Sequence, residues 1–361
     1  MTLAVVRTLG SAQGLRSEHF TQDFEQELVD QYVIASDGLS DQFVAQERGT
    51  IFEFIRFVGR PVWTVEAADG DKYMQWLRRE RGLAHSTLQN KACTIGRFFD
   101  FVIARYQGDI QELFDCVVAS PIDEFNKPRS KSRSASTRIP PRVEEVKVLF
   151  DGWADALPDA RKYLPAARDY VAASLWRRLG LRINETVMLD LRDWHPDLGD
   201  HGKLHVRFGK GSRGRGPKVR IIPAINDADA LLEWWLNEVR PQFGDDWDDP
   251  DAPMFPSERR DRISTRCARV GDDALRAGLN AAVQAWLPTW SGRLTPHGLR
   301  HYCASSLYQR GLNLKAIQEL LGHEWLSTTT VYVHVHDRHI ERSWAVANER
   351  LTTRFHDGKE G

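Results

Sequence analysis

The chain has 361 residues, of which 42% are apolar and 27% are charged, and its formal net charge is −1. This composition is that of an ordinary globular protein, and the length predicts about two domains. No apolar run approaches the ~18 residues that a membrane span needs, and the N-terminus has no secretory signal pattern, so we expect a cytoplasmic protein without a membrane partner. The four cysteines lie far apart, which indicates reduced thiols rather than a disulfide framework.

The N-terminal third predicts an extension followed by a small helical domain. Residues 1–34 show weak periodicity and are expected to order, if at all, on a partner. Ser40, Thr64 and Ser86 are each placed to cap a helix that carries an apolar stripe. These stripes are expected to pack in a core rather than bind a ligand. A helical domain is therefore predicted over residues 35–118.

A basic linker is predicted over residues 119–139. Its central part, residues 126–138, has five basic residues, no acid and almost no apolar residue, so it cannot bury enough surface to fold alone. It is either a solvated hinge with incidental charge or a strip that lies along a phosphate backbone. The side chains that the second alternative places on DNA are Lys127, Arg129, Lys131, Arg133 and Arg138.

The second domain is predicted over residues 140–338 and is mainly helical with one small sheet. Helices are expected from Val143 to Trp153 and from about Pro165 to Leu179. The predicted sheet is a pair of alternating strands around residues 204–208 and 219–221, joined by a turn rich in Gly and Arg. A later helix is expected to end at Pro241, residues 244–251 to form an acidic surface loop, and everything from Gly271 onward to be helical.

The segment from Thr295 to Arg300 has the pattern of a helix start. Thr295 is a good cap, and Pro296 suits the first helical position, where no N–H is needed. His297 and Arg300 are three residues apart and therefore share one face of that helix.

The next segment places a histidine and a tyrosine directly beyond helix ends. Asn313 can cap a helix that Gly322 stops with a left-handed residue, and His323 follows immediately. Ser327 can cap a last short helix that displays Tyr332.

The chain resembles the tyrosine recombinase (phage integrase) family in three boxes that occur in the family's order. Gly-Leu-Arg-Ile-Asn-Glu at 180–185 looks like the first arginine box, and residues 295–300 look like the H-x-x-R box. Leu-Gly-His at 321–323, with Thr328-Thr329 and then Tyr332 nine residues after the histidine, looks like the LGH…TT…Y box. Residues 208–211 resemble the hairpin that presents the family's lysine. The resemblance covers roughly residues 35–350.

The resemblance implies transesterification through a 3′-phosphotyrosine, with no cofactor, no metal and no small-molecule substrate. Tyr332 would be the nucleophile, because a phenolate can attack a phosphodiester and leave again. Planar guanidinium groups bind the nonbridging oxygens of the transition state, so Arg182 and Arg300 would form the clamp. The full set of catalytic assignments is Arg182, Lys210, His297, Arg300, His323 and Tyr332.

The other roles follow from the same resemblance. His323 would donate to the phosphate, His297 would assist proton transfer at the tyrosine, and Lys210 would protonate the departing 5′ oxygen. Glu185, one turn after Arg182, would hold an active-site side chain in place. Within the hairpin turn, Arg213 and Lys218 are rivals to Lys210 for the lysine's role. The remaining basic side chains of the turn, Arg213, Arg215 and Lys218, are otherwise expected to contact phosphates.

The family's architecture implies a C-shaped clamp around double-stranded DNA, made of a helical core-binding domain and a catalytic domain. A terminal helix within residues 339–361 would dock on a neighbouring subunit, giving a tetramer on two paired sites; docking back on its own subunit is the alternative. The short N-terminal extension favours a simple recombinase, either a resolvase of replicon dimers or an enzyme of a mobile element. The direction of the reaction stays open.

Three other interpretations remain. A type IB topoisomerase-like enzyme would use the same chemistry to relax supercoils without pairing sites. A DNA-binding accessory protein would keep the fold without catalysis, although all six expected positions are filled here. His297 and His301 have a spacing that also suits zinc, but no accompanying glutamate or cysteine is suitably placed.

Overall fold

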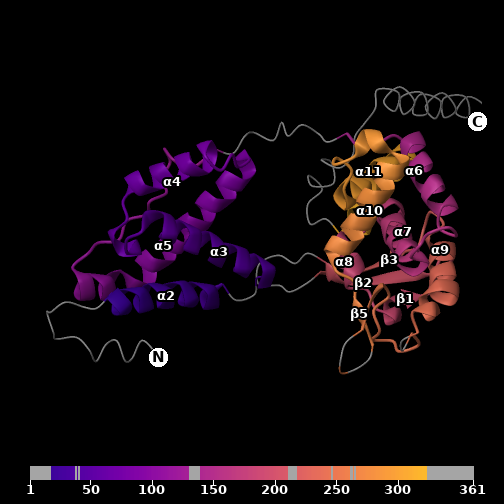
Figure 1. Ribbon diagram of the computed structural model, residues 1–361, viewed down its shortest axis with the longest axis horizontal. Coiled ribbons are helices and arrows are strands. Elements are labelled where there is room, and N and C mark those ends of the chain that lie inside the picture. The colour runs from indigo at the N-terminus through magenta and orange to yellow at the C-terminus, as the bar shows by residue number, and fades with distance from the viewer. Residues whose placement is uncertain are drawn as a thin grey trace, which may run out of the picture. The chain divides into compact units, whose positions relative to one another are not determined.

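The computed structural model describes residues 18–36, 39, 41–129, 139–209, 218–244, 247–260, 263 and 266–322. The chain divides into two compact units, and the described residues up to 129 belong to the first and those from 139 onward to the second. Both units are mainly helical (Figure 1). None of the described helices combines the length and apolarity that crossing a membrane requires.

The first unit is a helical domain with one continuous apolar core. Its described α-helices are α2 (Glu18–Ala35), α3 (Asp41–Val58), α4 (Ala67–Arg79) and α5 (His85–Phe114). Aromatic rings from three of these helices meet edge to face, with the Phe54 ring centroid 5.0 Å from that of Tyr73 and 6.0 Å from that of Phe99. Such pairs add to the stabilisation that burial provides.

The prediction of an extension over residues 1–34 is wrong from Glu18 onward, because α2 belongs to the core of the first unit. Phe24, Leu28 and Tyr32 are buried at a spacing of four residues, which places them on one face of the helix. The Tyr32 hydroxyl also donates to Glu47 on α3 at 2.9 Å. The stripe was short and interrupted by polar residues, so its periodicity was weak. Residues 1–17 lie outside the described residues.

Two predicted helix starts shift by a few residues. Thr64 lies in a short 3-10 turn, η1 (Val62–Thr64), where its hydroxyl donates to the Pro61 carbonyl at 2.7 Å, and it is not the N-cap of α4. Helix α4 begins after Glu66 instead, whose N–H donates to the Asp69 carboxylate at 2.9 Å. Likewise α5 begins at His85, one residue before the predicted cap Ser86.

The first part of the predicted linker is folded onto the first unit. Asn126 is buried; its Nδ2 donates to the Pro121 carbonyl at 2.8 Å, and its Oδ1 accepts from the Asp123 N–H at 3.0 Å. Gly70 on α4 permits the close approach, since a Cβ there would overlap the Pro121 carbonyl. Residues 119–129 are therefore ordered by side chain–backbone hydrogen bonds, which the composition did not reveal. Residues 130–138 lie outside the described residues.

The second unit has a larger core, with Trp176 and Trp235 fully buried in it. Its described α-helices are α6 (Val143–Asp155), α7 (Tyr163–Leu179), α8 (Ile183–Val187), α9 (Ala228–Trp234), α10 (Asp272–Trp286), α11 (Pro296–Gln309) and α12 (Leu314–Leu321), with short turns η2 (Leu191–Asp193) and η5 (Pro288–Trp290) between them. The predicted helices over 143–153 and 165–179 are confirmed as α6 and α7.

Pro241 does not end its helix. After α9 the chain continues through a π-helical turn, η3 (Trp235–Val239), and a 3-10 turn, η4 (Arg240–Phe243), in which Pro241 occupies an initial position. A proline is tolerated there because the missing N–H has no helical partner to lose. The turn ends at Gly244, which has the left-handed φ of 64°.

The predicted hairpin is confirmed, but the expectation of one small sheet is wrong. Strands β1 (Trp194–His195), β2 (Lys203–Gly209) and β3 (Lys218–Pro223) form an antiparallel sheet in the order β1-β2-β3. A second sheet pairs β4 (Pro256–Arg260) with β5 (Cys267–Arg269). These two strands have no apolar alternation, so their pairing rests on contacts that the sequence pattern does not carry.

Candidate active site

Local capping fixes the ends of the helices that carry the boxes. The Thr295 hydroxyl accepts from the Gly298 N–H at 3.1 Å, and the Asn313 side chain accepts from the Ala316 N–H at 2.7 Å. Gly322 ends α12 with a φ of 67°. All three sequence-based predictions are confirmed, because each depends on residues no more than four positions apart.

The first arginine box is the sharp turn between α7 and α8. Gly180 has a φ of 66°, and a Cβ at this position would overlap the Leu321 side chain and approach the Cys303 sulfur at 3.4 Å. Only glycine suits both the backbone conformation and the packing. Arg182 then lies at the N-cap position of α8.

Arg300 joins the three boxes in space. Its side chain is 0% exposed; Nη1 donates to the Gly180 carbonyl and Nη2 to the Leu321 carbonyl at 2.7 Å. The H-x-x-R box is thereby bound to the arginine box on one side and to the LGH segment on the other. His297, one turn earlier on α11, is exposed, and its ring centroid lies 4.9 Å from that of His301.

Glu185 accepts hydrogen bonds from Arg182, as it would if it held this active-site side chain in place. Its carboxylate is 1% exposed and accepts from the Arg182 backbone N–H at 2.8 Å and from Arg182 Nη1 at 2.7 Å. The Arg182 side chain is 26% exposed, and its other side-chain nitrogens have no partner among the described residues. This leaves hydrogen-bond donors at the protein surface beside a fixed carboxylate.

Arg220 completes this cluster, although it belongs to none of the sequence motifs. Arg220 Nη1 and Nη2 donate to the two oxygens of Glu185 at 2.9 and 2.8 Å, and Nε donates to the Leu320 carbonyl at 3.1 Å. On β3 the apolar side chains Val219 and Ile221 are exposed, whereas Arg220 faces inward. The alternating exposure of side chains along this strand could have indicated the role of Arg220, because an arginine on the inner face of a strand needs a carboxylate partner.

The site has an excess of positive charge around one carboxylate. Burial by itself raises the pKa of Glu185, but the hydrogen bonds from Arg220 and the charges of Arg220, Arg182 and Arg300 together lower it to about 2. Three guanidinium groups facing one carboxylate leave a net positive site at neutral pH. Such a site suits the oxygens of a phosphodiester.

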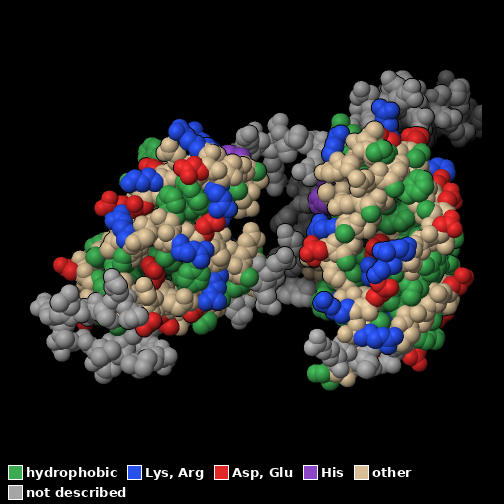
Figure 2. Space-filling view, viewed as in Figure 1, with side chains coloured by type: hydrophobic (Ala, Val, Ile, Leu, Met, Phe, Trp, Pro, Cys, Tyr) green, Lys and Arg blue, Asp and Glu red, His purple; other side chains and the backbone are tan. Residues whose placement is uncertain are grey.

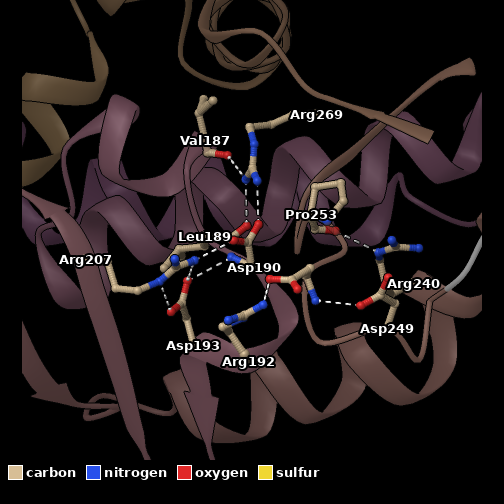
Figure 3. Close-up of polar contacts among 11 residues, drawn as sticks. Val187, Leu189, Asp190, Arg192, Asp193, Arg207, Arg240, Asp249, Pro253 and Arg269 are labelled. Carbon is tan, nitrogen blue, oxygen red and sulfur yellow. Dashed lines mark hydrogen bonds and ion pairs between the residues drawn. The ribbon is translucent and has the colours of Figure 1, made fainter. Parts of the chain in front are cut away.

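A second ion-pair cluster, Asp190, Asp193, Arg207 and Arg269, lies in the same unit (Figure 3). Arg207 on β2 donates from Nε to Asp193 at 2.6 Å and also pairs with Asp190. Arg269 on β5 pairs with Asp190 and donates to the carbonyl of Val187 at 2.7 Å. The cluster connects β2, the segment after α8 and the second sheet. No sequence motif predicted it.

Several predicted side chains lie outside the described residues: Lys131, Arg133, Arg138, Lys210, Arg213, Arg215, His323 and Tyr332. Of the predicted DNA contacts that are described, Lys127 and Arg129 are exposed on the first unit, and Lys218 begins β3. Lys and Arg side chains lie among acidic ones on the visible surface of each unit (Figure 2), so the net charge of −1 reflects mixing of the two signs.

A model of the phage integrase family matches residues 154–339 of the chain, which include all three boxes. Among curated relatives, the tyrosine recombinase XerC of Vibrio vulnificus is 28% identical over 335 residues, covering 91% of this chain and 92% of the relative. The tyrosine recombinase XerC of Salmonella typhi is 29% identical over 276 residues, covering 75% of this chain and 77% of the relative.

Solved structures share the fold. The Tn1549 transposon integrase in complex with circular intermediate DNA has a TM-score of 0.59 at 16% identity, covering 89% of this chain and 98% of that one. A lambda integrase dimer bound to a core site has a TM-score of 0.58 at 16% identity, covering 87% and 96%.

Proposed function

The chain belongs to the phage integrase family, the tyrosine recombinases, and on that premise we propose that Arg182, Arg300 and Tyr332 carry out its strand transfer. The protein is a site-specific DNA recombinase. The observation that carries the assignment is Arg300, which binds the carbonyls of Gly180 and Leu321 and so connects the three boxes.

In the proposed reaction the Tyr332 oxygen attacks the phosphorus and the bond to the 5′ oxygen breaks. Arg182 and Arg300 stabilise the charge that gathers on the nonbridging oxygens, and His323 adds a hydrogen bond there. His297 takes the tyrosine proton, and Lys210 returns a proton to the departing 5′ oxygen. The products are a 3′-phosphotyrosine and a free 5′-hydroxyl, which attacks the next strand, so the phosphoester bond is conserved throughout.

Covalent trapping tests this assignment. The wild type, Tyr332→Phe and a control, Tyr163→Phe at the start of α7, are incubated without metal with nicked DNA from the region that flanks the gene, and adducts are resolved on denaturing gels. An adduct with the wild type and the control alone is expected. An adduct with Tyr332→Phe contradicts the nucleophile, and DNA binding without any adduct points to the accessory-protein alternative.

Pairing of sites separates a recombinase from a topoisomerase-like enzyme. The proposal is that subunits assemble as a tetramer on two sites and exchange a helix within residues 339–361. Deleting these residues is then expected to abolish cooperative binding to paired half-sites, measured by gel shift, while binding to a single half-site persists. Unchanged cooperativity would exclude this exchange, and relaxation of plasmids that lack a site would favour the topoisomerase alternative.

Contacts to phosphates are proposed for Lys127, Arg129 and Lys218, together with the basic residues predicted in the linker and the hairpin turn. Neutralising any one of them should weaken DNA binding similarly on all sequences. It should also reduce the slope of log affinity against log salt by about one.

A further inference from the structure

Arg220 is the junction of three chain segments that meet at the candidate active site. It lies on β3, the strand that leaves the hairpin turn, and it is 11% exposed. Its two terminal nitrogens bind both oxygens of Glu185, and its Nε binds the carbonyl of Leu320, near the end of α12. A Cβ on Gly322 would lie 3.0 Å from Arg220 Cδ and Nη1, so the residue before His323 packs directly on this side chain.

We infer that Arg220 is a positioning residue for strand cleavage: it holds Glu185, and through it Arg182, in register with the end of α12. The inference rests on the proposed function, because it concerns the same phosphate site. Arg220 directs Nε, Nη1 and Nη2 to protein oxygens, whereas the side chain of Arg182 beside it is 26% exposed. Arg220 therefore acts on the phosphate through its neighbours.

The geometry explains why an arginine is needed here. A planar fork can bind a carboxylate with two nitrogens and a carbonyl with the third, which a lysine ammonium cannot do at fixed positions. Without Arg220, the buried Glu185 would lose two guanidinium hydrogen bonds and would still face Arg182 and Arg300. Arg182 would then turn further toward Glu185 and away from the phosphate, because an under-compensated buried carboxylate attracts the nearest donor.

The test is single-turnover cleavage of a nicked half-site, with the covalent adduct as readout, for Arg220→Met and Arg220→Lys. Removing a group that orients an active-site side chain typically costs about 10- to 100-fold in activity. We expect that loss in the cleavage rate at saturating protein, with unchanged affinity for the half-site. Arg220→Lys retains the charge without the fork and is expected to be slowed as well.

Arg168 on α7 offers a matched control. It is also buried, it donates from Nε and Nη2 to the Asp169 carboxylate and from Nη1 to the Pro256 carbonyl, and none of these partners belongs to the site. Arg168→Met should therefore lower the urea midpoint of unfolding, as we also expect of Arg220→Met, and leave the cleavage rate of the folded fraction unchanged.

Two further readouts separate positioning from general stability. Glu185→Gln combined with Arg220→Met should cleave about as slowly as Glu185→Gln alone, because the arginine acts through that carboxylate. Arg220→Met alone should show an additional acid-side step in the pH profile of cleavage that the double variant lacks.

If Arg220→Met cleaves at the wild-type rate, the inference is overturned. It is also overturned if weaker DNA binding or a smaller folded fraction fully explains the slower cleavage by Arg220→Met. Additive effects in the double variant overturn it too. If the wild type itself forms no adduct, the proposed function fails, and the inference fails with it.

Discussion

Arg300 donates a hydrogen bond from Nη2 to the Leu321 carbonyl at 2.7 Å, two residues before His323 in the chain. The same guanidinium binds the Gly180 carbonyl through Nη1. A buried guanidinium is costly without polar partners, so these two carbonyls and Glu185, 4.0 Å away, help to hold Arg300 in place. Packing within the protein thus fixes this arginine before any DNA is present.

Replacing Arg300 with lysine should abolish most cleavage although the charge is kept. One ammonium cannot span two carbonyls and a phosphate, so we expect the rate of adduct formation to fall by about 10²- to 10³-fold. Arg310→Lys is a suitable control, because Arg310 at the end of α11 donates to the partly buried Asn226 side chain at 2.6 Å and to none of the described residues of the three boxes. Single-turnover trapping checks both variants, and near-normal cleavage by Arg300→Lys would contradict the expectation.

Gly180→Ala should destabilise the second unit more than a substitution at a comparable glycine. The new Cβ would meet a left-handed backbone and the side chains of Leu321 and Cys303, which together cost about 2–4 kcal/mol. Gly292→Ala is the control: its φ of 69° is similar, but nothing lies within 4 Å of a Cβ there, so about 1 kcal/mol is expected. Urea unfolding measures both, and equal losses would contradict the packing argument.

Asp169 should make the protein less stable as the pH rises from about 4 to 6. Burial raises the pKa of this carboxyl to about 6, although the charge of Arg168 and its hydrogen bonds lower it. A carboxyl whose pKa is higher in the folded state binds its proton more tightly there, so the contribution is greatest below the unfolded pKa and is lost above about pH 6, by roughly 2–3 kcal/mol.

Asp169→Asn removes this titration and should flatten the dependence of the urea midpoint on pH between 4 and 7. The residue lies against α10, where a Cβ on Gly278 would overlap its carboxylate, so the substitution keeps a similar shape in a tight space. An unchanged pH dependence in the variant would show that other groups cause it.

Glu185 should have the opposite pH dependence. Its pKa is lowered to about 2, so its contribution to stability is present above the unfolded pKa of about 4.3 and is lost as the pH falls toward 2. The difference in unfolding free energy between wild type and Glu185→Gln should therefore shrink on acidification, by roughly 2–3 kcal/mol between pH 6 and 2. A difference that stays constant over this range would contradict the ionised Glu185 cluster.

Prediction from the sequence was most accurate where the cause is local. Thr295, Asn313 and Gly322 were each assigned from the few residues around them, and each makes the expected cap or turn. Thr64 shows the limit of such reasoning, because its hydroxyl binds Pro61 within a 3-10 turn and the helix begins only at Ala67.

The order and content of the three boxes also lie in the sequence, and with them the family, the mainly helical fold and the hairpin. Tertiary structure alone decided that α2 belongs to the first core, that residues 119–129 fold onto α4, and that β4 pairs with β5. It also decided that Arg220 binds Glu185, 35 residues away along the chain. The reason is that caps and turns depend on neighbouring residues, whereas core membership and buried ion pairs depend on which distant side chains the whole fold brings together.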